Sequence, residues 1–340
     1  MGPRRTFVAL LAPLWLSCAH SAPPPADAIR PAWPSPPARA RVRWLAAFPN
    51  PGTPGTPSAS FWSRAFDFIT GQDPDPAASR PPLRRPFGLA VWESNLLVAD
   101  PDAGQVLRIR WRTGDVELLA CADRPWSMPL AIAIAPDGSL WIADGGAGVV
   151  VRREPNGHCR ALGEGRLARP SGIAMSGKVA YVVDPPNHAV WRLGLDGTVL
   201  GRLGERGTGE GQFNFPTGIA ALPDGSVLVV DALNFRVVRL SAEGKPLATF
   251  GEAGDSGGAF ARPKAVAVDE VGKIYVSDAQ NDVILVYGRE GAFDLAVGGS
   301  GQGPGQFSLP AGLAVAEGYL FVADSYNRRV AIFELLGGPR

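Results

Sequence analysis

The sequence predicts an all-β fold, a β-propeller of six blades, and three observations lead to this prediction. A pattern in which an apolar strand ends in aspartate and a polar turn follows occurs six times, at Asp100, Asp144, Asp184, Asp231, Asp278 and Asp324. Successive aspartates are 44, 40, 47, 47 and 46 residues apart, and a period of about 40–50 residues is typical of four-stranded propeller blades. The chain also contains 42 Gly and 33 Pro, which suits many short strands joined by turns.

Residues 1–17 have the features of a signal peptide. Arg4 and Arg5 precede an apolar run over residues 7–17, and these 11 residues are too short to span a membrane core of about 30 Å. Cys18 follows at once in LWLSCAHS, and this arrangement resembles a bacterial lipoprotein signal, in which the cysteine is lipidated. The alternative is ordinary cleavage after Ala19 or Ala22, which gives a soluble secreted protein.

Residues 18–40 are rich in proline and alanine, and we expect them to form an extended tether rather than part of the core. The domain would then occupy residues 41–340. In a lipidated protein, this tether would hold the domain away from the membrane.

Each repeat predicts four strands in a fixed order. A leading proline opens a first strand of small apolar residues, as in RPFGLAV, RPSGIAM and LPAGLAV, and small residues suit the crowded axis of a propeller. The second strand ends at the aspartate, as in SVLVVD, and a third (RVVRL) and a fourth (PLATF) follow. Period-two alternation and β-branched residues support strands throughout.

The two ends of the chain are expected to complete one blade together. The sixth repeat lacks a fourth strand after AIFELL, whereas residues 41–48 resemble a fourth strand that has no blade of its own. We therefore predict that 41–48 pairs with 328–335. This pairing would close the ring and remove the exposed strand edges of an open array.

One short helix is expected in an insertion between the closing strand and the first blade. In residues 58–71, Phe61, Trp62, Ala65, Phe66 and Ile69 fall on one face at helical spacing. We expect the helix to plug the propeller's own rim. The alternative is that Trp62 and Phe66 dock a partner or cover the channel.

Between blades, the repeats carry a recognisable motif. The pattern P-x-G-I-A…V-x-D-x-x-N-x-R-V, together with GERGTGEGQFNFPTGIA and GGSGQGPGQFSLPAGLA, resembles NHL repeats over about residues 84–335. The motif is specific in blades 3 to 6, which carry Asn187, Asn234, Asn281 and Asn327, whereas blades 1 and 2 carry Ala103 and Ala147 at this position. The resemblance implies a six-bladed β-propeller.

The six repeated aspartates are expected to be structural rather than catalytic. A carboxylate at a strand end can accept backbone N–H bonds from the turn that follows, and the Asn three residues later tolerates a left-handed φ. Asp100, Asp144, Asp184, Asp231, Asp278 and Asp324 would then be six copies of one turn staple.

Strand direction places the candidate binding residues on one rim. In antiparallel blades, the turns after the aspartates and the loops between blades lie at the same end of the propeller. The candidates flank the leading prolines: Arg85, Phe87, Arg169, Phe215, Arg262 and Lys264. The basic side chains could bind a carboxylate or phosphate; alternatively, they could form ion pairs with acids on neighbouring blades.

Composition argues against several function classes. The 33 Lys and Arg balance 32 Asp and Glu, so a footprint for nucleic acid is not expected. Amidating lyases with this architecture use a histidine-bound zinc, but this chain has only His20, His158 and His188. The inner strands do not supply the oxygen ligands of a gluconolactonase-like calcium site, so no metal and no cofactor is expected.

Cys121 and Cys159 fall on the fourth strands of adjacent blades. We expect two small core residues at opposite ends of their strands, with a disulfide as the alternative that export would permit.

The prediction for function is a non-enzymatic, exported and monomeric propeller. It would act as a binding or scaffold module at the bacterial cell envelope, in the outer membrane or periplasm, or as a secreted protein. Its partner would be a protein or a small anionic ligand at the rim, and its only membrane contact a lipid anchor. The alternative is a lactonase- or lyase-like enzyme with its site at the channel mouth.

Overall fold

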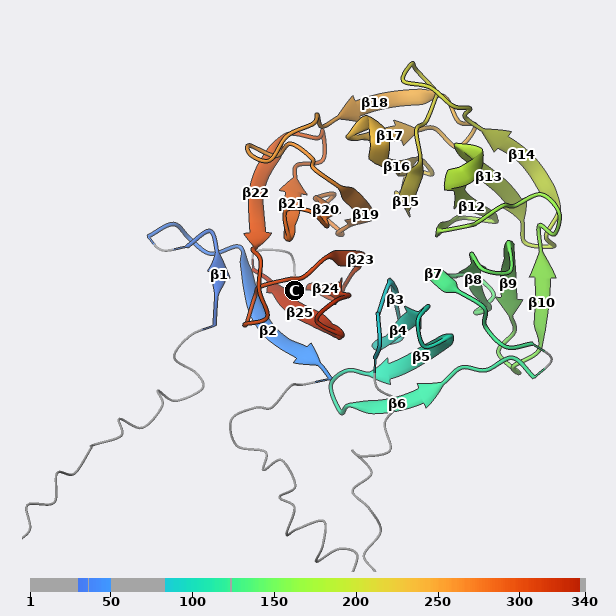
Figure 1. Cartoon of the computed structure of the whole chain (residues 1–340), viewed down its shortest axis with the longest axis horizontal. Helices are drawn as coiled ribbons and strands as arrows, with labels where there is room; N and C mark the ends of the chain where they lie inside the picture. Colours follow the sequence, from blue (N-terminus) through green and yellow to red (C-terminus); the bar gives the residue numbers. More distant parts are fainter. Residues whose placement is uncertain (1–29, 36, 50–82, 123, 337–340) are drawn as a thin grey trace, which may run out of the picture.

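A computed structural model describes residues 30–35, 37–49, 83–122 and 124–336, and these form six β-sheets arranged radially in a ring (Figure 1). Within each blade the strands are antiparallel and follow one another from the axis outward. The predicted all-β, six-bladed propeller is therefore confirmed. In the described part of the chain, the two helical segments are three-residue 3₁₀ turns, and no helix is long and apolar enough to cross a membrane.

Blade 1 contains β3 (Gly88–Trp92), β4 (Asn95–Asp100), β5 (Gln105–Arg110) and β6 (Asp115–Leu118). Blade 2 contains β7 (Pro129–Ile134), β8 (Leu140–Asp144), β9 (Val149–Arg153) and β10 (Cys159–Leu162). Blade 3 contains β11 (Gly172–Ser176), β12 (Val179–Asp184), η2 (Pro185–Asn187), β13 (Ala189–Gly194) and β14 (Val199–Leu203). Blades 4 and 5 contain β15 (Pro216–Ala221), β16 (Val227–Asp231), η3 (Ala232–Asn234), β17 (Arg236–Leu240) and β18 (Pro246–Phe250); and β19 (Pro263–Val268), β20 (Ile274–Asp278), β21 (Val283–Tyr287) and β22 (Phe293–Gly298). Blade 6 contains β23 (Pro310–Ala316), β24 (Tyr319–Asp324) and β25 (Arg329–Leu335), followed outward by β2 (Val42–Phe48) and β1 (Ala32–Trp33).

The two ends of the chain close the ring in blade 6, as the sequence predicts. Strand β2 pairs antiparallel with β25, from Val42 opposite Leu335 to Phe48 opposite Val330. Strand β1 then pairs with β2 and gives this blade a fifth strand, so that part of the segment expected as a tether joins the sheet. The predicted helix at 58–71 lies outside the described residues, as do residues 1–17 and Cys18.

The hydrophobic core is divided into six layers, one between each pair of neighbouring blades. Leu320 and Val322 of blade 6 pack with Tyr275 and Val286 of blade 5, for example, and the other five interfaces are built in the same way. The layer between blades 6 and 1 includes Phe48 of the closing strand. Closure therefore covers apolar surface on both sides of blade 6 as well as pairing the strand edge.

The inner strands approach one another so closely that two positions require glycine. A Cβ at Gly312 of blade 6 would lie 2.0 Å from the carbonyl oxygen of Phe87 in blade 1. A Cβ at Gly88 of blade 1 would lie 2.4 Å from the carbonyl oxygen of Leu130 in blade 2. Glycine two residues after the leading proline thus lets neighbouring backbones meet at the axis, and it fixes the spacing of the residues at the channel mouth.

The outermost strands run around the circumference of the ring, because twist accumulates across each blade (Figure 1). The end of one outer strand therefore reaches the beginning of the next. Cys121, after β6, forms a disulfide with Cys159 at the start of β10, with Cα atoms 5.7 Å apart. The expectation of two unbridged core cysteines at opposite ends of their strands was wrong, because it treated the outer strands as parallel to the propeller axis.

Candidate functional site

All six turn aspartates are buried at the ends of the second strands. Their carboxylates accept hydrogen bonds from the backbone of the loop that precedes the leading proline of the same blade, and in three blades also from the turn that follows. The backbone donors are Arg84, Arg85 and Ala103 for Asp100; Ser127, Met128 and Ala147 for Asp144; Ala168 and Arg169 for Asp184; Asn214 for Asp231; Ala261, Arg262, Gln280 and Asn281 for Asp278; and Ser308 for Asp324.

These contacts differ in two ways from the turn staple that the sequence suggests. Every carboxylate is bonded to the loop before its blade, about 16 residues upstream in the case of Asp144 and Met128, so it ties the second strand to the interblade loop. The left-handed residue is not the Asn but the residue after it, such as Phe235 (φ 54°) after Asn234. In blades 3, 4 and 6 the Asn instead donates its side-chain amide to the carboxylate, for example at 2.7 Å from Asp231.

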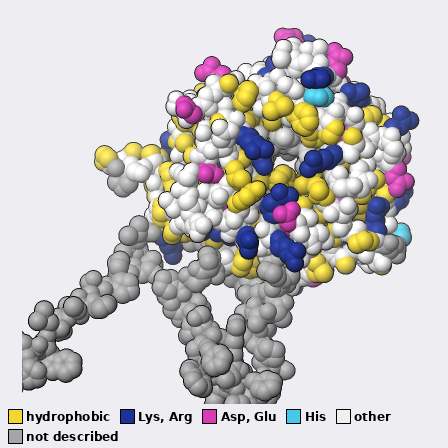
Figure 2. Space-filling model, in the orientation of Figure 1, with side chains coloured by type: hydrophobic (Ala, Val, Ile, Leu, Met, Phe, Trp, Pro, Cys, Tyr) yellow, Lys and Arg dark blue, Asp and Glu magenta, His cyan; other side chains and the backbone are white. Residues whose placement is uncertain are grey.

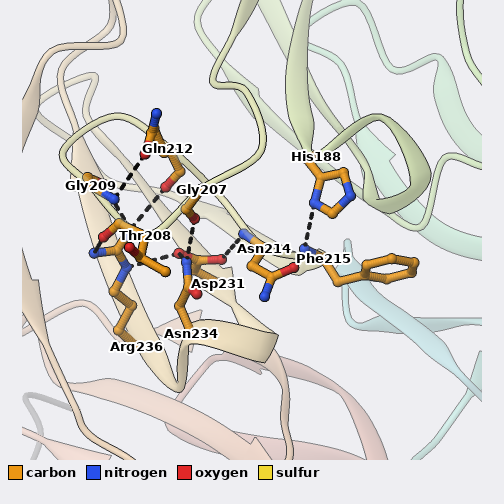
Figure 3. Close-up of polar contacts among 10 residues, drawn as sticks. All are labelled: His188, Gly207, Thr208, Gly209, Gln212, Asn214, Phe215, Asp231, Asn234 and Arg236. Atoms are coloured by element: carbon orange, nitrogen blue, oxygen red, sulfur yellow. Dashed lines mark hydrogen bonds and ion pairs between the residues drawn. The ribbon is translucent and has the colours of Figure 1, made fainter.

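Blades 4 and 6 add an arginine to this arrangement. The carboxylate of Asp231 accepts hydrogen bonds from Asn234 (2.7 Å) and from Arg236 Nε (2.8 Å), as Figure 3 shows. Arg236 also donates to the carbonyl oxygens of Thr208, Gly209 and Gln212 in the glycine-rich loop. The guanidinium thus makes four hydrogen bonds within the protein and has a structural role.

Blade 6 repeats this cluster in a more buried form. Arg329, 5% exposed, donates from Nε to Asp324 at 2.7 Å and from its terminal nitrogens to three loop carbonyls. Burial raises the pKa of the Asp324 carboxyl, while bonds from Ser308, Asn327 and Arg329 oppose that rise. A carboxylate enclosed by donors in this way is not available to a substrate.

The residues directly after the leading prolines lie close together around the propeller axis: Ser171 donates to the carbonyl of Thr217, and Thr217 donates to that of Lys264. We call these six the mouth residues: Phe87, Leu130, Ser171, Thr217, Lys264 and Ala311. Figure 2 shows several Lys and Arg side chains around the central hollow of the viewed face. Among the mouth residues, Lys264 is the one that carries a charge.

Lys264 is held by a rigid backbone and reaches across the neighbouring blade. The hydroxyl of Thr217 donates to the carbonyl oxygen of Lys264 at 2.8 Å, and the next residue, Ala265, donates its N–H to Ser277. The Lys264 ammonium lies 5.4 Å from the ring centroid of Phe87 in blade 1. Blade 6 lies between the two and contributes only Ala311 at the equivalent position, which leaves room for the lysine side chain.

Burial and positively charged neighbours both disfavour the protonated form of Lys264. Burial, followed by the positive charges of Arg262 and Arg85, lowers its pKa to about 8. Within the described residues, no carboxylate forms an ion pair with Lys264 or Arg262. An anion at this position would therefore gain Coulomb energy without displacing an existing partner.

The other two candidate arginines differ from each other. Arg85 forms an ion pair with Asp102 at 2.8 Å. The alternative expected from the sequence was an ion pair with an acid on a neighbouring blade, whereas Asp102 belongs to the same blade as Arg85. The Arg169 side chain is exposed and contacts the sulfur of Met128 in blade 2 at 3.9 Å. The structure therefore brings Arg85, Arg262, Lys264 and Phe87 together at blades 5 and 1, whereas Arg169 lies at blade 3.

Phe215 forms a separate aromatic contact on the rim. The residue is 43% exposed, and its ring packs edge-on against that of His188 in blade 3, with ring centroids 5.3 Å apart. Its N–H donates to His188 Nδ1 at 3.2 Å (Figure 3). Trp62 and Phe66, the remaining candidates, lie outside the described residues. Among the residues that are described, no group of three His, Cys, Asp or Glu side chains could hold a metal ion.

The sequence reasoning did not find a groove of about 1080 Å³ between blades 5 and 6. It is lined by turns after the first strands, including Val271 and Glu317, and by Arg41 at the start of the closing strand. Next to this groove, the Asp294 carboxylate accepts hydrogen bonds from Arg41 and Lys273. Burial raises the pKa of Asp294, but these two cations outweigh that effect and lower it. Long-range closure creates this groove, so no local sequence motif could have signalled it.

Comparison with known proteins supports the fold and one repeat. Residues 213–240 match the family model described as NHL repeat. The fold is similar to that of virginiamycin B lyase from Staphylococcus aureus, solved as an inactive variant with quinupristin (TM-score 0.55, 16% identity, 74% of this chain and 80% of that chain). It is also similar to a gluconolactonase from Xanthomonas campestris (TM-score 0.58, 19% identity, 75% and 87%) and to a putative gluconolactonase (TM-score 0.59, 19% identity, 79% and 96%). A search of curated proteins finds no match.

Proposed function

We propose that this propeller is an exported, non-enzymatic binding module that receives an anionic group at the channel mouth between blades 5 and 1. The observation that carries the proposal is the basic cluster of Lys264, Arg262 and Arg85. Lys264 and Arg262 have no carboxylate partner among the described residues, and for the half-buried Lys264 an unpaired charge is unfavourable. A carboxylate or phosphate of a partner protein or a small ligand would supply that partner.

The rigid framework around the cluster also supports binding. Hydrogen bonds with the Thr217 and Ser277 hydroxyls fix the carbonyl of Lys264 and the N–H of Ala265, so the lysine stem starts from a defined position. The exposed ring of Phe215 adds apolar surface on the same rim. Aromatic residues and arginine around a restricted opening are typical of energetically important interface positions.

The proposal is tested by calorimetric titration of the purified protein with citrate and, separately, with an oligoglutamate peptide. We expect saturable binding of at least one probe, which weakens at high salt. The Arg262→Gln variant should lower the affinity about tenfold, equivalent to about 1.4 kcal/mol. The control Lys245→Gln removes an exposed lysine elsewhere in blade 4 and should leave the affinity unchanged. Absence of binding to both probes, or an equal effect of both variants, would contradict the proposal.

Catalysis at the channel mouth is the second candidate, and the shared fold of a lyase and a gluconolactonase is the observation that favours it. It is tested with gluconolactone and with a streptogramin B substrate, with and without added divalent cations. Turnover that disappears in the Lys264→Met variant would replace the binding proposal with an enzymatic one.

The membrane anchor in this proposal is a lipid on Cys18. The Cys18→Ser variant should move from the membrane fraction of cells to the soluble fraction, whereas a Cys121→Ser control should remain with the membrane. Equal membrane retention of Cys18→Ser and wild type would exclude the anchor and favour the secreted form.

A further inference from the structure

Lys264 differs from the other lysines of the chain in its surroundings. The sequence contains four lysines, Lys178, Lys245, Lys264 and Lys273. Lys178 and Lys245 are exposed, and Lys273 forms an ion pair with Asp294 at 3.1 Å. Lys264 is half-buried, its Nζ faces the Phe87 ring, and Arg262 and Arg85 supply positive charge beside it.

We propose that the Lys264 amine binds its ligand covalently, as an imine with the carbonyl carbon of a small oxo acid, an aldehyde or ketone that carries a carboxylate. This inference rests on the proposed function, because the same mouth first has to hold the anion. The carboxylate would pair with the guanidinium of Arg262, and with that of Arg85 where Asp102 leaves it free to donate. The carbonyl group would then face the amine beside the Phe87 ring.

The step needs no further reactant. The nitrogen lone pair of the neutral amine attacks the carbonyl carbon, the carbonyl oxygen takes up the protons that the nitrogen loses, and water leaves as the C=N bond forms. Hydrolysis reverses the reaction and releases the oxo acid unchanged. The protein thus gains a reversible covalent bond to its ligand without any oxidation or reduction.

The electrostatic surroundings favour this chemistry at neutral pH. With a pKa of about 8, about a fifth of the Lys264 side chains carry a neutral amine at pH 7.4, compared with about 0.1% for an ordinary lysine. The charged groups that act on it are Arg262, directly before β19, and Arg85 from blade 1, whose partner is Asp102. Thr217 and Phe87, the other residues in contact with Lys264, are uncharged.

The test traps the imine by reduction. The purified protein is incubated with glyoxylate and cyanoborohydride at pH 7.4, and peptide mass spectrometry measures the rate of carboxymethylation at each of the four lysines and at the N-terminal amine. We expect Lys264 to react at least about tenfold faster than Lys178 and Lys245, since the rate follows the fraction of neutral amine. Excess citrate should slow the reaction at Lys264 alone.

Two variants keep the test decisive. Lys264→Arg preserves the positive charge and should abolish the fast reaction, while Arg262→Gln should slow it by weakening the hold on the carboxylate. Equal rates at all four lysines, or no adduct at Lys264, would overturn the inference. Glycolate, which lacks the aldehyde of glyoxylate, separates the two proposals. If glycolate binds and Lys264 is not trapped, only the imine fails. If glycolate, citrate and oligoglutamate all fail to bind, the proposed function fails as well.

Discussion

Blades 4 and 6 hold their turn aspartates differently from blades 1 and 2. In blades 1 and 2, Asp100 and Asp144 each accept three backbone N–H groups, two from the loop and one from the turn. In blades 4 and 6, one loop N–H remains, and an Asn and an Arg side chain provide the other donors. Each carboxylate therefore has at least three donors, although their chemical origin differs.

The backbone of the loop explains the exchange. Phe215 and Leu309, which precede the leading prolines of blades 4 and 6, have positive φ values of 53° and 50°. Their N–H groups consequently turn away from the aspartate and donate to His188 Nδ1 and to Asp282 in the preceding blades. In both blades the arginine Nε donates to the aspartate in place of this N–H group. A repeat can thus lose or gain side-chain contacts as long as the carboxylate remains saturated.

The largest expected effect comes from removing a carboxylate that faces an arginine. Asp324→Ala leaves the buried guanidinium of Arg329 without its counter-charge, and breaking a buried pair in this way costs about 3–5 kcal/mol. Asp144→Ala leaves only backbone amides unpaired and should cost about 1–3 kcal/mol. Chemical denaturation of both variants measures the difference in the free energy of unfolding.

A double variant sharpens this comparison. Asp324→Ala combined with Arg329→Met removes both charges and should be more stable than Asp324→Ala alone. If Asp144→Ala is as destabilising as Asp324→Ala, the arginine contributes nothing to the difference between the blades.

Blades 1 and 2 have a crosslink that the described parts of blades 4 and 6 lack. The Cys121–Cys159 disulfide closes a loop of 38 residues, and loss of such a bond typically costs about 2–4 kcal/mol. Cys159→Ser should therefore lower the melting temperature under oxidising conditions. Reductant should lower the melting temperature of the wild type and have no effect on the variant. A wild type that melts identically with and without reductant would show that the bond does not stabilise these blades.

Much of the fold follows from local patterns in the sequence. The repeated aspartate and the leading proline mark where the second strand ends and the first begins, so the number of blades can be counted directly. The pairing of 41–48 with 328–335 was predictable because one repeat lacks a strand and another segment has no blade. The disulfide was not, because it depends on the direction in which twist turns the outer strands, and no single blade contains that information.

The site was less predictable, for a physical reason. The sequence places Lys264 and Phe87 at the same position of two different repeats, but their contact depends on the small side chain of Ala311 in the blade between them. The distribution of acids was equally hidden: Arg85 finds Asp102, whereas Arg262 finds no described carboxylate. Whether an arginine finds a carboxylate depends on how the six blades pack together. The sequence of one repeat is compatible with a paired or an unpaired arginine.

The smallest expected change in stability comes from replacing Lys264 among the mouth residues. In blades 4 and 6 the buried charges have ionic partners, whereas Lys264 in blade 5 has no carboxylate partner among the described residues, so its charge opposes folding. Lys264→Met keeps the length of the side chain and its contact with Phe87, and should raise the free energy of unfolding at pH 7 by about 1–2 kcal/mol, after allowance for partial exposure.

The pH dependence gives this prediction its sign. The pKa of Lys264 is about 8 in the folded chain and near the ordinary value of 10.5 in the unfolded chain. The unfolded chain therefore binds more protons between about pH 8 and 10.5, and the stability of the wild type rises across this window relative to the Met variant. Denaturation of both proteins at pH 7 and pH 10.5 should show a difference at the lower pH that disappears at the higher one. A wild type that is the more stable protein at pH 7 would mean that a partner already neutralises Lys264, and the mouth would then lack the unpaired charge on which anion binding depends.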